Sequence, residues 1–245
     1  MTETTLDLRT ADGVMDVYLY QPAGNGPWPA AILYMDAMAV RPDLRSMAAR
    51  LAANGYFVVL PNLYYRSAPV APVDISSFVK PGPERDRVFA LIASIDGPKV
   101  MADTRAILEF LANAPQANGK AGTVGYCMGG GYALLAAGTF PDRIQAAASF
   151  HGGSLATDSP HSPHLLASKI AAEVYVGVAG IDPMFSDEQR ERIRQALQDA
   201  GVTFTLEVYP DVKHGFTVTG HPAYDRTASE RHWDKLLDLF GRALG

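Results

Sequence analysis

The sequence predicts an α/β fold, in which helices cover both faces of a mostly parallel sheet. Short apolar runs alternate with helix-forming segments along most of the chain, and this is the pattern of strand–helix–strand units. The chain has 245 residues, of which 48% are hydrophobic and 19% are charged. This length and composition suffice for one large hydrophobic core. We therefore expect residues 1–245 to form a single domain.

The first half of the chain predicts an antiparallel edge followed by parallel strands. Strand-like runs at Thr4–Leu8 and Val14–Tyr20 are joined by a turn at Ala11-Asp12-Gly13, which indicates a hairpin. The elements expected next are the buried strands Ala30–Tyr34 and Tyr56–Leu60, the helices Pro42–Asn54, Glu84–Ile95 and Pro98–Asn113, and an irregular, Pro-rich segment from Pro61 to Pro83.

The second half continues the alternation of strands and helices. A buried strand at Gly122–Tyr126 is followed by a helix-forming run at Tyr132–Gly138. Later elements are the strands Ile144–Phe150, Val174–Val178 and Thr203–Tyr209, a helix from the capping box at Ser186 to Ala200, and a final helix at Tyr224–Leu244. Because few residues separate Phe150 from Val174, we expect no large cap domain.

Composition excludes several classes of function. The net charge is −5 and no cluster of basic residues occurs, so nucleic acid is not an expected partner. A single cysteine excludes an intrachain disulfide and a cysteine-based zinc site. His161 and His164 lie in a polar loop without a carboxylate or cysteine beside them, so we expect no metal. No targeting signal and no membrane-spanning apolar stretch is found, and a cytoplasmic location is expected.

The most informative segment is Gly125-Tyr126-Cys127-Met128-Gly129, which joins a predicted strand to a predicted helix. A strand, a sharp Gly-x-Cys-x-Gly turn and a helix form the nucleophile elbow, here with Cys in place of Ser. Gly125 and Gly129 would give the backbone the room that this turn needs. Cys127 would then be exposed at the carboxyl edge of the sheet as a nucleophile.

Two other interpretations of this segment exist. A lone cysteine at the end of a strand is often a small buried hydrophobic residue. A Gly-rich turn before a helix can also bind phosphate, but the spacing is not Gly-x-Gly-x-x-Gly and no Gly-Lys-Ser/Thr follows. The elbow pattern favours the nucleophile.

A cysteine nucleophile needs a base, and the base needs an orienting acid. In a parallel sheet these groups lie at the carboxyl ends of strands, where the loops converge. Asp182 and His214 each follow a predicted strand, and the order of nucleophile, acid and histidine fits this architecture. We expect His214 to move the proton and Asp182 to orient its imidazole. Asp187 is a weaker candidate for the acid because it lies in the capping box, and Asp211 is too close in sequence to His214.

The loops around the elbow supply the other expected site residues. The amide of Met128 opens the helix, and a second oxyanion donor is expected from the amide of Ala37, after the strand Ala30–Tyr34. Asp36 would point into the site, although it could equally be an ordinary loop residue. His151 follows another strand and is expected in the pocket wall.

The sequence resembles the dienelactone hydrolase family of α/β-hydrolases. The matching segments are Gly125-Tyr-Cys-Met-Gly-Gly130, Pro61-Asn-Leu-Tyr-Tyr-Arg66, Gly180-Ile-Asp182 and His214-Gly-Phe216, which together span nearly the whole chain. The resemblance implies the α/β-hydrolase fold without a cap domain. It also implies a Cys127–His214–Asp182 triad and cofactor-free hydrolysis of esters or lactones through an acyl-enzyme.

The resemblance also implies how a substrate would be held. Members that cleave dienelactone carry an acidic residue beside the oxyanion loop, a position that Asp36 matches with a shorter side chain. They carry two arginines that hold the substrate carboxylate; Arg85 matches the first, whereas Val218 stands where the second would fall. The hold on a carboxylate would therefore be weaker here. Arg85 could also be a solvated residue in the first turn of a helix.

Aromatic residues near predicted strand ends, Tyr64 and Phe216 among them, could line an apolar substrate pocket, although such residues are as often part of the core. We therefore predict a cofactor-independent hydrolase of small carboxylic esters or lactones, acting as a monomer or weak homodimer. Two alternatives remain: a non-catalytic ligand receptor with the same fold, and a thiol redox protein that uses Cys127 without a resolving cysteine.

Overall fold

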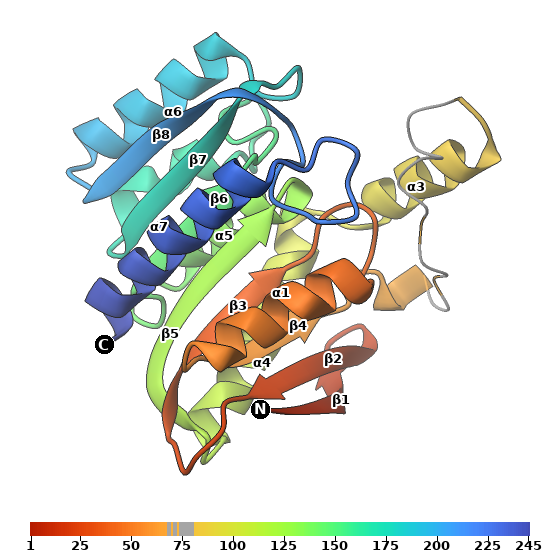
Figure 1. Cartoon of the computed structure of the whole chain (residues 1–245), viewed down its shortest axis with the longest axis vertical. Helices are drawn as coiled ribbons and strands as arrows, with labels where there is room; N and C mark the ends of the chain where they lie inside the picture. Colours follow the sequence, from red (N-terminus) through yellow and green to blue (C-terminus); the bar gives the residue numbers. More distant parts are fainter. Residues whose placement is uncertain (68–69, 71–72, 74–80) are drawn as a thin grey trace.

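The computed structural model of the chain describes residues 1–67, 70, 73 and 81–245. Within them, eight strands form one sheet in the order β1-β2-β4-β3-β5-β6-β7-β8 (Figure 1). The strands are β1 (Thr2–Thr10), β2 (Gly13–Gln21), β3 (Trp28–Tyr34), β4 (Phe57–Pro61), β5 (Ala117–Tyr126), β6 (Ala146–Phe150), β7 (Glu173–Ile181) and β8 (Phe204–Lys213).

The sheet has an antiparallel edge and a parallel body. Strands β1 and β2 form an antiparallel hairpin, as the turn at Ala11-Asp12-Gly13 predicts, and β2 pairs in antiparallel fashion with β4. From β4 to β8 all neighbouring strands are parallel. The carboxyl ends of β3 and β5 to β8 therefore meet at one edge of the sheet, and the loops that carry the expected site residues converge there.

Helices cover both faces of the sheet (Figure 1). The α-helices of the described residues are α1 (Pro42–Ala53), α3 (Pro83–Ser94), α4 (Gly97–Asn113), α5 (Met128–Thr139), α6 (Asp187–Asp199) and α7 (Arg226–Leu244). On one face α1 lies beside α7, joined by an ion pair of 2.6 Å between Arg50 and Glu230, with the Arg50 guanidinium over the ring of Trp233. On the other face α4 packs against α5.

Helix α5 extends four residues ahead of the helix-forming run at Tyr132–Gly138 and opens at Met128, where the expected oxyanion donor requires it. Three consecutive glycines, which have low helix propensity, lie in this first turn. A Cβ on Gly129 would lie 2.5 Å from the carbonyl oxygen of Tyr34 in β3. Close packing of α5 on the sheet thus requires glycine here and outweighs the propensity.

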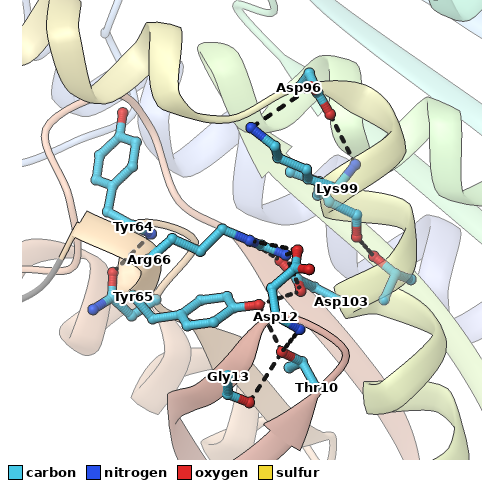
Figure 2. Close-up of polar contacts among 12 residues, drawn as sticks. Thr10, Asp12, Gly13, Tyr64, Tyr65, Arg66, Asp96, Lys99 and Asp103 are labelled. Carbon is cyan, nitrogen blue, oxygen red and sulfur yellow. Dashed lines mark hydrogen bonds and ion pairs between the residues drawn. The ribbon is translucent and has the colours of Figure 1, made fainter.

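A buried charged cluster fixes the chain after β4 to the rest of the fold (Figure 2). Arg66 donates two hydrogen bonds of 2.8 Å to the carboxylate of Asp103 in α4, and it also bonds Asp12 in the β1–β2 turn. The hydroxyl of Tyr65 donates to Asp103 at 2.9 Å and lies 2.7 Å from the hydroxyl of Thr10. The cluster thereby positions the neighbouring Tyr64.

These observations confirm the predicted fold class. The residues between β6 and β7 form loops and a short 3-10 helix, η2 (Pro163–Lys169), and no large cap. The expected irregular segment Pro61–Pro83 lies partly outside the described residues. No helix in the described part of the chain has the length and apolar character needed to cross a membrane.

Candidate active site

Cys127 occupies the sharp turn between β5 and α5. The backbone φ of Cys127 is +55°, a conformation that residues other than glycine rarely adopt. A Cβ on Gly125 would overlap the backbone of Gly129, so the turn depends on glycine at the predicted positions. The amide of Cys127 donates to the carbonyl of Phe150 at 3.2 Å, which ties the turn to the end of β6. The thiol is partly exposed and lines a cavity.

Asp182 and His214, which follow β7 and β8, form a direct pair. Nδ1 of His214 lies 2.8 Å from an Asp182 oxygen, and the Asp182 side chain is only 1% exposed. The other Asp182 oxygen accepts a hydrogen bond of 2.9 Å from the amide of Met184. The carboxylate is thus held in place, and Nδ1 serves as the donor in this pair when Asp182 is ionised.

The second ring nitrogen of His214 is available for chemistry. Nε2 is buried and has no hydrogen-bond partner among the described residues, and His214 and Cys127 line the same cavity. Burial lowers the pKa of His214, but the hydrogen bond to Asp182 and the nearby Cys127 thiol outweigh burial and raise this pKa to about 10. His214 is therefore protonated at neutral pH and can stabilise a thiolate.

The two expected oxyanion donors lie at the same end of the cavity. Met128 and Ala37 both line it, and the amide of Met128, as the first residue of α5, has no carbonyl partner within the helix. The hydroxyl of Tyr64 donates to the carbonyl of Ala37 at 3.1 Å. Tyr64 is fully buried and is absent from the described cavity lining. Tyr64 thus supports the oxyanion loop through this hydrogen bond, and its expected contact with substrate stays a prediction.

Asp36 lines the cavity, but its carboxylate is already bound. Arg41 donates two hydrogen bonds to it, of 2.7 and 2.8 Å, and the amide of Met38 donates a third of 2.9 Å. Arg41 itself is 5% exposed. Sequence reasoning missed this arginine, because its contact with Asp36 depends on the path of the loop after β3. The bidentate pair holds Asp36 in one geometry.

His151 lies in the cavity wall, where the sequence predicts it. One ring nitrogen is 2.8 Å from the hydroxyl of Thr217, and the ring packs edge-on against His214, with centroids 5.0 Å apart. Burial, together with the charge of His214, lowers its pKa well below the ordinary value, so His151 is neutral at neutral pH. Phe216 packs behind His151, is fully buried and does not appear in the described lining. Phe216 therefore supports His151, and its expected contact with substrate stays a prediction.

The two positions at which arginines would hold a substrate carboxylate differ in their place at the cavity. Val218 lines the cavity and is buried. Arg85, in the first turn of α3, stacks over the ring of Phe89, which lines the cavity, and is not itself among the described lining residues. The expected contact of Arg85 with substrate stays a prediction.

The cavity measures about 470 Å³. Besides the residues above, sequence reasoning missed several side chains that line it: Met38, Phe89, Ile92, Tyr132, Leu135, Met184 and His221. In the described part of the chain no group of three or more His, Cys, Asp or Glu residues could hold a metal ion.

Comparison with known proteins identifies the family. Residues 15–244 match the Dienelactone hydrolase family. An Escherichia coli O157:H7 protein named provisionally as a carboxymethylenebutenolidase is 29% identical over 235 residues, covering 92% of this chain and 82% of that protein. The carboxymethylenebutenolidase of Rhodococcus opacus is 25% identical over 232 residues, covering 93% and 86%.

A solved structure supports the fold independently. A Klebsiella pneumoniae protein named provisionally as a dienelactone hydrolase superposes with a TM-score of 0.85 at 23% identity, covering 98% of each chain. At this identity the likeness concerns the fold alone. The family match confirms the resemblance seen in the sequence and the prediction of a hydrolase class. The chain therefore belongs to the dienelactone hydrolase family, a family of carboxylic ester and lactone hydrolases with the α/β-hydrolase fold.

Proposed function

We propose that this protein hydrolyses carboxylic esters or lactones through a Cys127–His214–Asp182 triad and an acyl-enzyme. The observation that carries the proposal is that Cys127 lines one cavity with His214, whose imidazole is held by the buried Asp182. Each residue follows a different strand of the sheet, and the carboxyl ends of these strands meet at one edge. The relatives named as carboxymethylenebutenolidases support the lactone or ester substrate class.

The proposed reaction has two steps. The Cys127 thiolate attacks the carbonyl carbon, and the amides of Met128 and Ala37 stabilise the oxyanion. The carbon–oxygen bond to the alcohol then breaks, protonated His214 donates its proton to the leaving oxygen, and a thioester remains. In the second step His214 takes a proton from water, and the hydroxide attacks the thioester. The carbon–sulfur bond then breaks, the carboxylic acid leaves, and the Cys127 thiolate is regenerated beside protonated His214.

The first test compares wild type with Cys127→Ala and His214→Ala on p-nitrophenyl butyrate and on a dienelactone. We expect wild type to hydrolyse at least one substrate and both variants to lose about two orders of magnitude or more in kcat/KM. Intact-mass measurement of quenched wild type would show the acyl adduct on Cys127. Circular dichroism checks that the variants fold.

Other outcomes would favour the alternatives. A receptor predicts ligand binding that survives Cys127→Ala and no turnover by wild type. A thiol redox protein predicts oxidation of Cys127 by peroxide and no acyl adduct. Equal activity of wild type and Cys127→Ala would contradict the proposed nucleophile.

We further propose a cytoplasmic enzyme that works as a monomer or weak homodimer. A reducing compartment would keep the only thiol free. Cell fractionation and light scattering after gel filtration test these two statements.

A further inference from the structure

One face of helix α5 forms the floor of the cavity. Met128, Gly131, Tyr132 and Leu135 all line the cavity. They are spaced at i, i+3, i+4 and i+7, which places them on a single helix face. At 1.5 Å per residue, this face runs about 10 Å away from the end of α5 that carries Cys127. The cavity is therefore a groove along α5, which we call the α5 groove.

The opposite face of α5 packs against the sheet, which leaves the cavity-lining face uncovered by the sheet. Ala133, Leu134, Ala136 and Ala137 are buried in the core against the sheet. Helix α5 is thus apolar on the α5 groove side as well as on the core side, although only the core side is covered by the sheet. An apolar surface continuous with a nucleophile is typical of a substrate site.

Apolar side chains also form part of the walls of the α5 groove. Phe89 and Ile92 of α3 line one part, and Pro163 and Met184 line another. Phe89 is 47% exposed and Met184 is 49% exposed. Large apolar side chains left exposed together at the edge of a cavity favour an apolar occupant.

The charged groups in the cavity do not favour an anionic occupant. The acidic lining residues are Asp36, bound by Arg41, and Asp96, whose carboxylate caps α4 by accepting from the amide of Lys99 at 2.9 Å. Arginine and lysine do not occur among the described lining residues, and the protonated His214 that lines the cavity is already paired with Asp182. An uncharged hydrocarbon chain fits this surface better than a carboxylate.

Leu135 closes the far end of the α5 groove. A second cavity of about 260 Å³ lies beyond it and shares Leu135, Gly97 and His161 with the first. Leu135 is 8% exposed, and its Cδ1 would lie 3.3 Å from a Cβ on Gly97, so the leucine packs tightly against the start of α4. Leu135 and Gly97 therefore lie where the two cavities adjoin.

We propose that the α5 groove binds the uncharged apolar chain of an ester substrate and that Leu135 sets the maximum chain length. The inference rests on the proposed function, because the chain must extend from the carbonyl that Cys127 attacks. The chain could belong to the acyl group or to the alcohol, and the experiment separates these sources.

The test measures kcat/KM for two ester series. In one, p-nitrophenyl esters carry acetyl, butyryl, octanoyl or dodecanoyl groups; in the other, acetate esters carry the corresponding alkyl alcohols. We expect wild type to prefer the octyl chain over the shortest chain by about tenfold or more in one series, and to disfavour the dodecyl chain. The series that shows this dependence identifies the source of the chain.

Two variants change the α5 groove in opposite directions. A Cβ on Gly131 would lie 3.8 Å from Pro163, so Gly131→Leu fits the helix while its longer side chain fills the groove. We expect its octyl-to-acetyl ratio to fall about tenfold. Leu135→Ala joins the two cavities, and its dodecyl-to-octyl ratio should rise about tenfold. Gly241→Leu is the matched control, because a Cβ on Gly241 in α7 has open space around it and lies outside the lining.

The outcomes are separable. Ratios that match wild type in both series, for folded Gly131→Leu and Leu135→Ala proteins, would overturn the groove inference while leaving the proposed hydrolysis intact. Absence of turnover by wild type on every ester would overturn the proposed function, and the groove inference with it. Opposite shifts in the two variants, with Gly241→Leu unchanged, would support both.

Discussion

The protonation state of His214 determines whether the leaving alkoxide can receive a proton, and it therefore affects the rate of ester hydrolysis. Its pKa is raised to about 10 by the hydrogen bond to Asp182 and the nearby thiol, although burial opposes this shift. At neutral pH the ring therefore carries a proton that it can donate to a leaving alkoxide. Above its pKa that proton is gone, and this step loses its acid.

We predict an alkaline limit near pH 10 in kcat/KM for an ester with an alkyl alcohol, after correction for spontaneous hydrolysis. In Asp182→Asn the hydrogen bond that raises the pKa is weakened. The limit should move down by about one pH unit or more, and the rate should fall by about two orders of magnitude or more.

The p-nitrophenyl ester of the same acid is the matched control. Its leaving group departs without a proton, so it should lose less activity above pH 10. An Asp182→Asn profile with the same alkaline limit as wild type would disprove the role assigned to this pair.

The role of the Asp36 side chain depends on its ion pair with Arg41. The sequence predicts an acid that points into the site, and Asp36 does line the cavity. Its ion pair with Arg41 could not be predicted from the motif, because it depends on the path of the loop after β3. Paired in this way, the carboxylate contributes fixed geometry to the loop that carries Ala37.

At the scale of elements, the cluster in Figure 2 joins three separate parts of the chain. Arg66 links α4, through Asp103, to the β1–β2 turn, through Asp12. The two acids differ in burial: the Asp103 side chain is 1% exposed and that of Asp12 is 47% exposed. Asp103 and Asp12 therefore allow a direct comparison of how much a buried and an exposed ion pair with Arg66 contribute to the free energy of unfolding.

We predict that Asp103→Ala lowers the free energy of unfolding by about 3–5 kcal/mol, because it leaves Arg66 largely buried without its main partner. Asp12→Ala should cost less than about 1 kcal/mol, because water replaces the exposed contact. Urea unfolding of both variants and wild type measures the difference. Equal losses would show that the cluster does not anchor the segment after β4.

Sequence predicts an element or a site residue best where its residue pattern is compatible with only one structure. Parallel strands meet at one sheet edge, so Cys127, Asp182 and His214 could be placed together from strand order alone. Tyr64 and Phe216 could not be placed, because an aromatic residue at a strand end packs equally well into the core or the site. The groove residue Leu135 was also missed, since a helix that is apolar all round gives no sign of which face stays open.

At the scale of the whole molecule, a buried histidine joins the last helix, α7, to the centre of the sheet. His232 of α7 is fully buried; its Nε2 lies 3.1 Å from the hydroxyl of Tyr126 in β5, and its Nδ1 lies 2.6 Å from the carbonyl of Ser229. Burial lowers its pKa from 6.5 to about 3. His232 is thus neutral in the folded protein over most of the acidic range in which the unfolded chain would protonate it.

This difference makes the fold sensitive to acid. Between pH 6.5 and pH 3 the unfolded chain binds a proton at position 232 that the folded protein does not, so stability falls as the pH falls through this window. At about 1.4 kcal/mol per pH unit, His232 alone would lower the free energy of unfolding by about 2 kcal/mol between pH 6.5 and pH 5.

The His232→Gln variant cannot take up this proton. Its free energy of unfolding, measured in urea at each pH, should fall by about 2 kcal/mol less than that of wild type over the same interval. The comparison uses the change with pH within each protein, so the hydrogen bonds lost in the variant cancel. Identical changes in the two proteins would show that protonation of His232 does not drive acid unfolding.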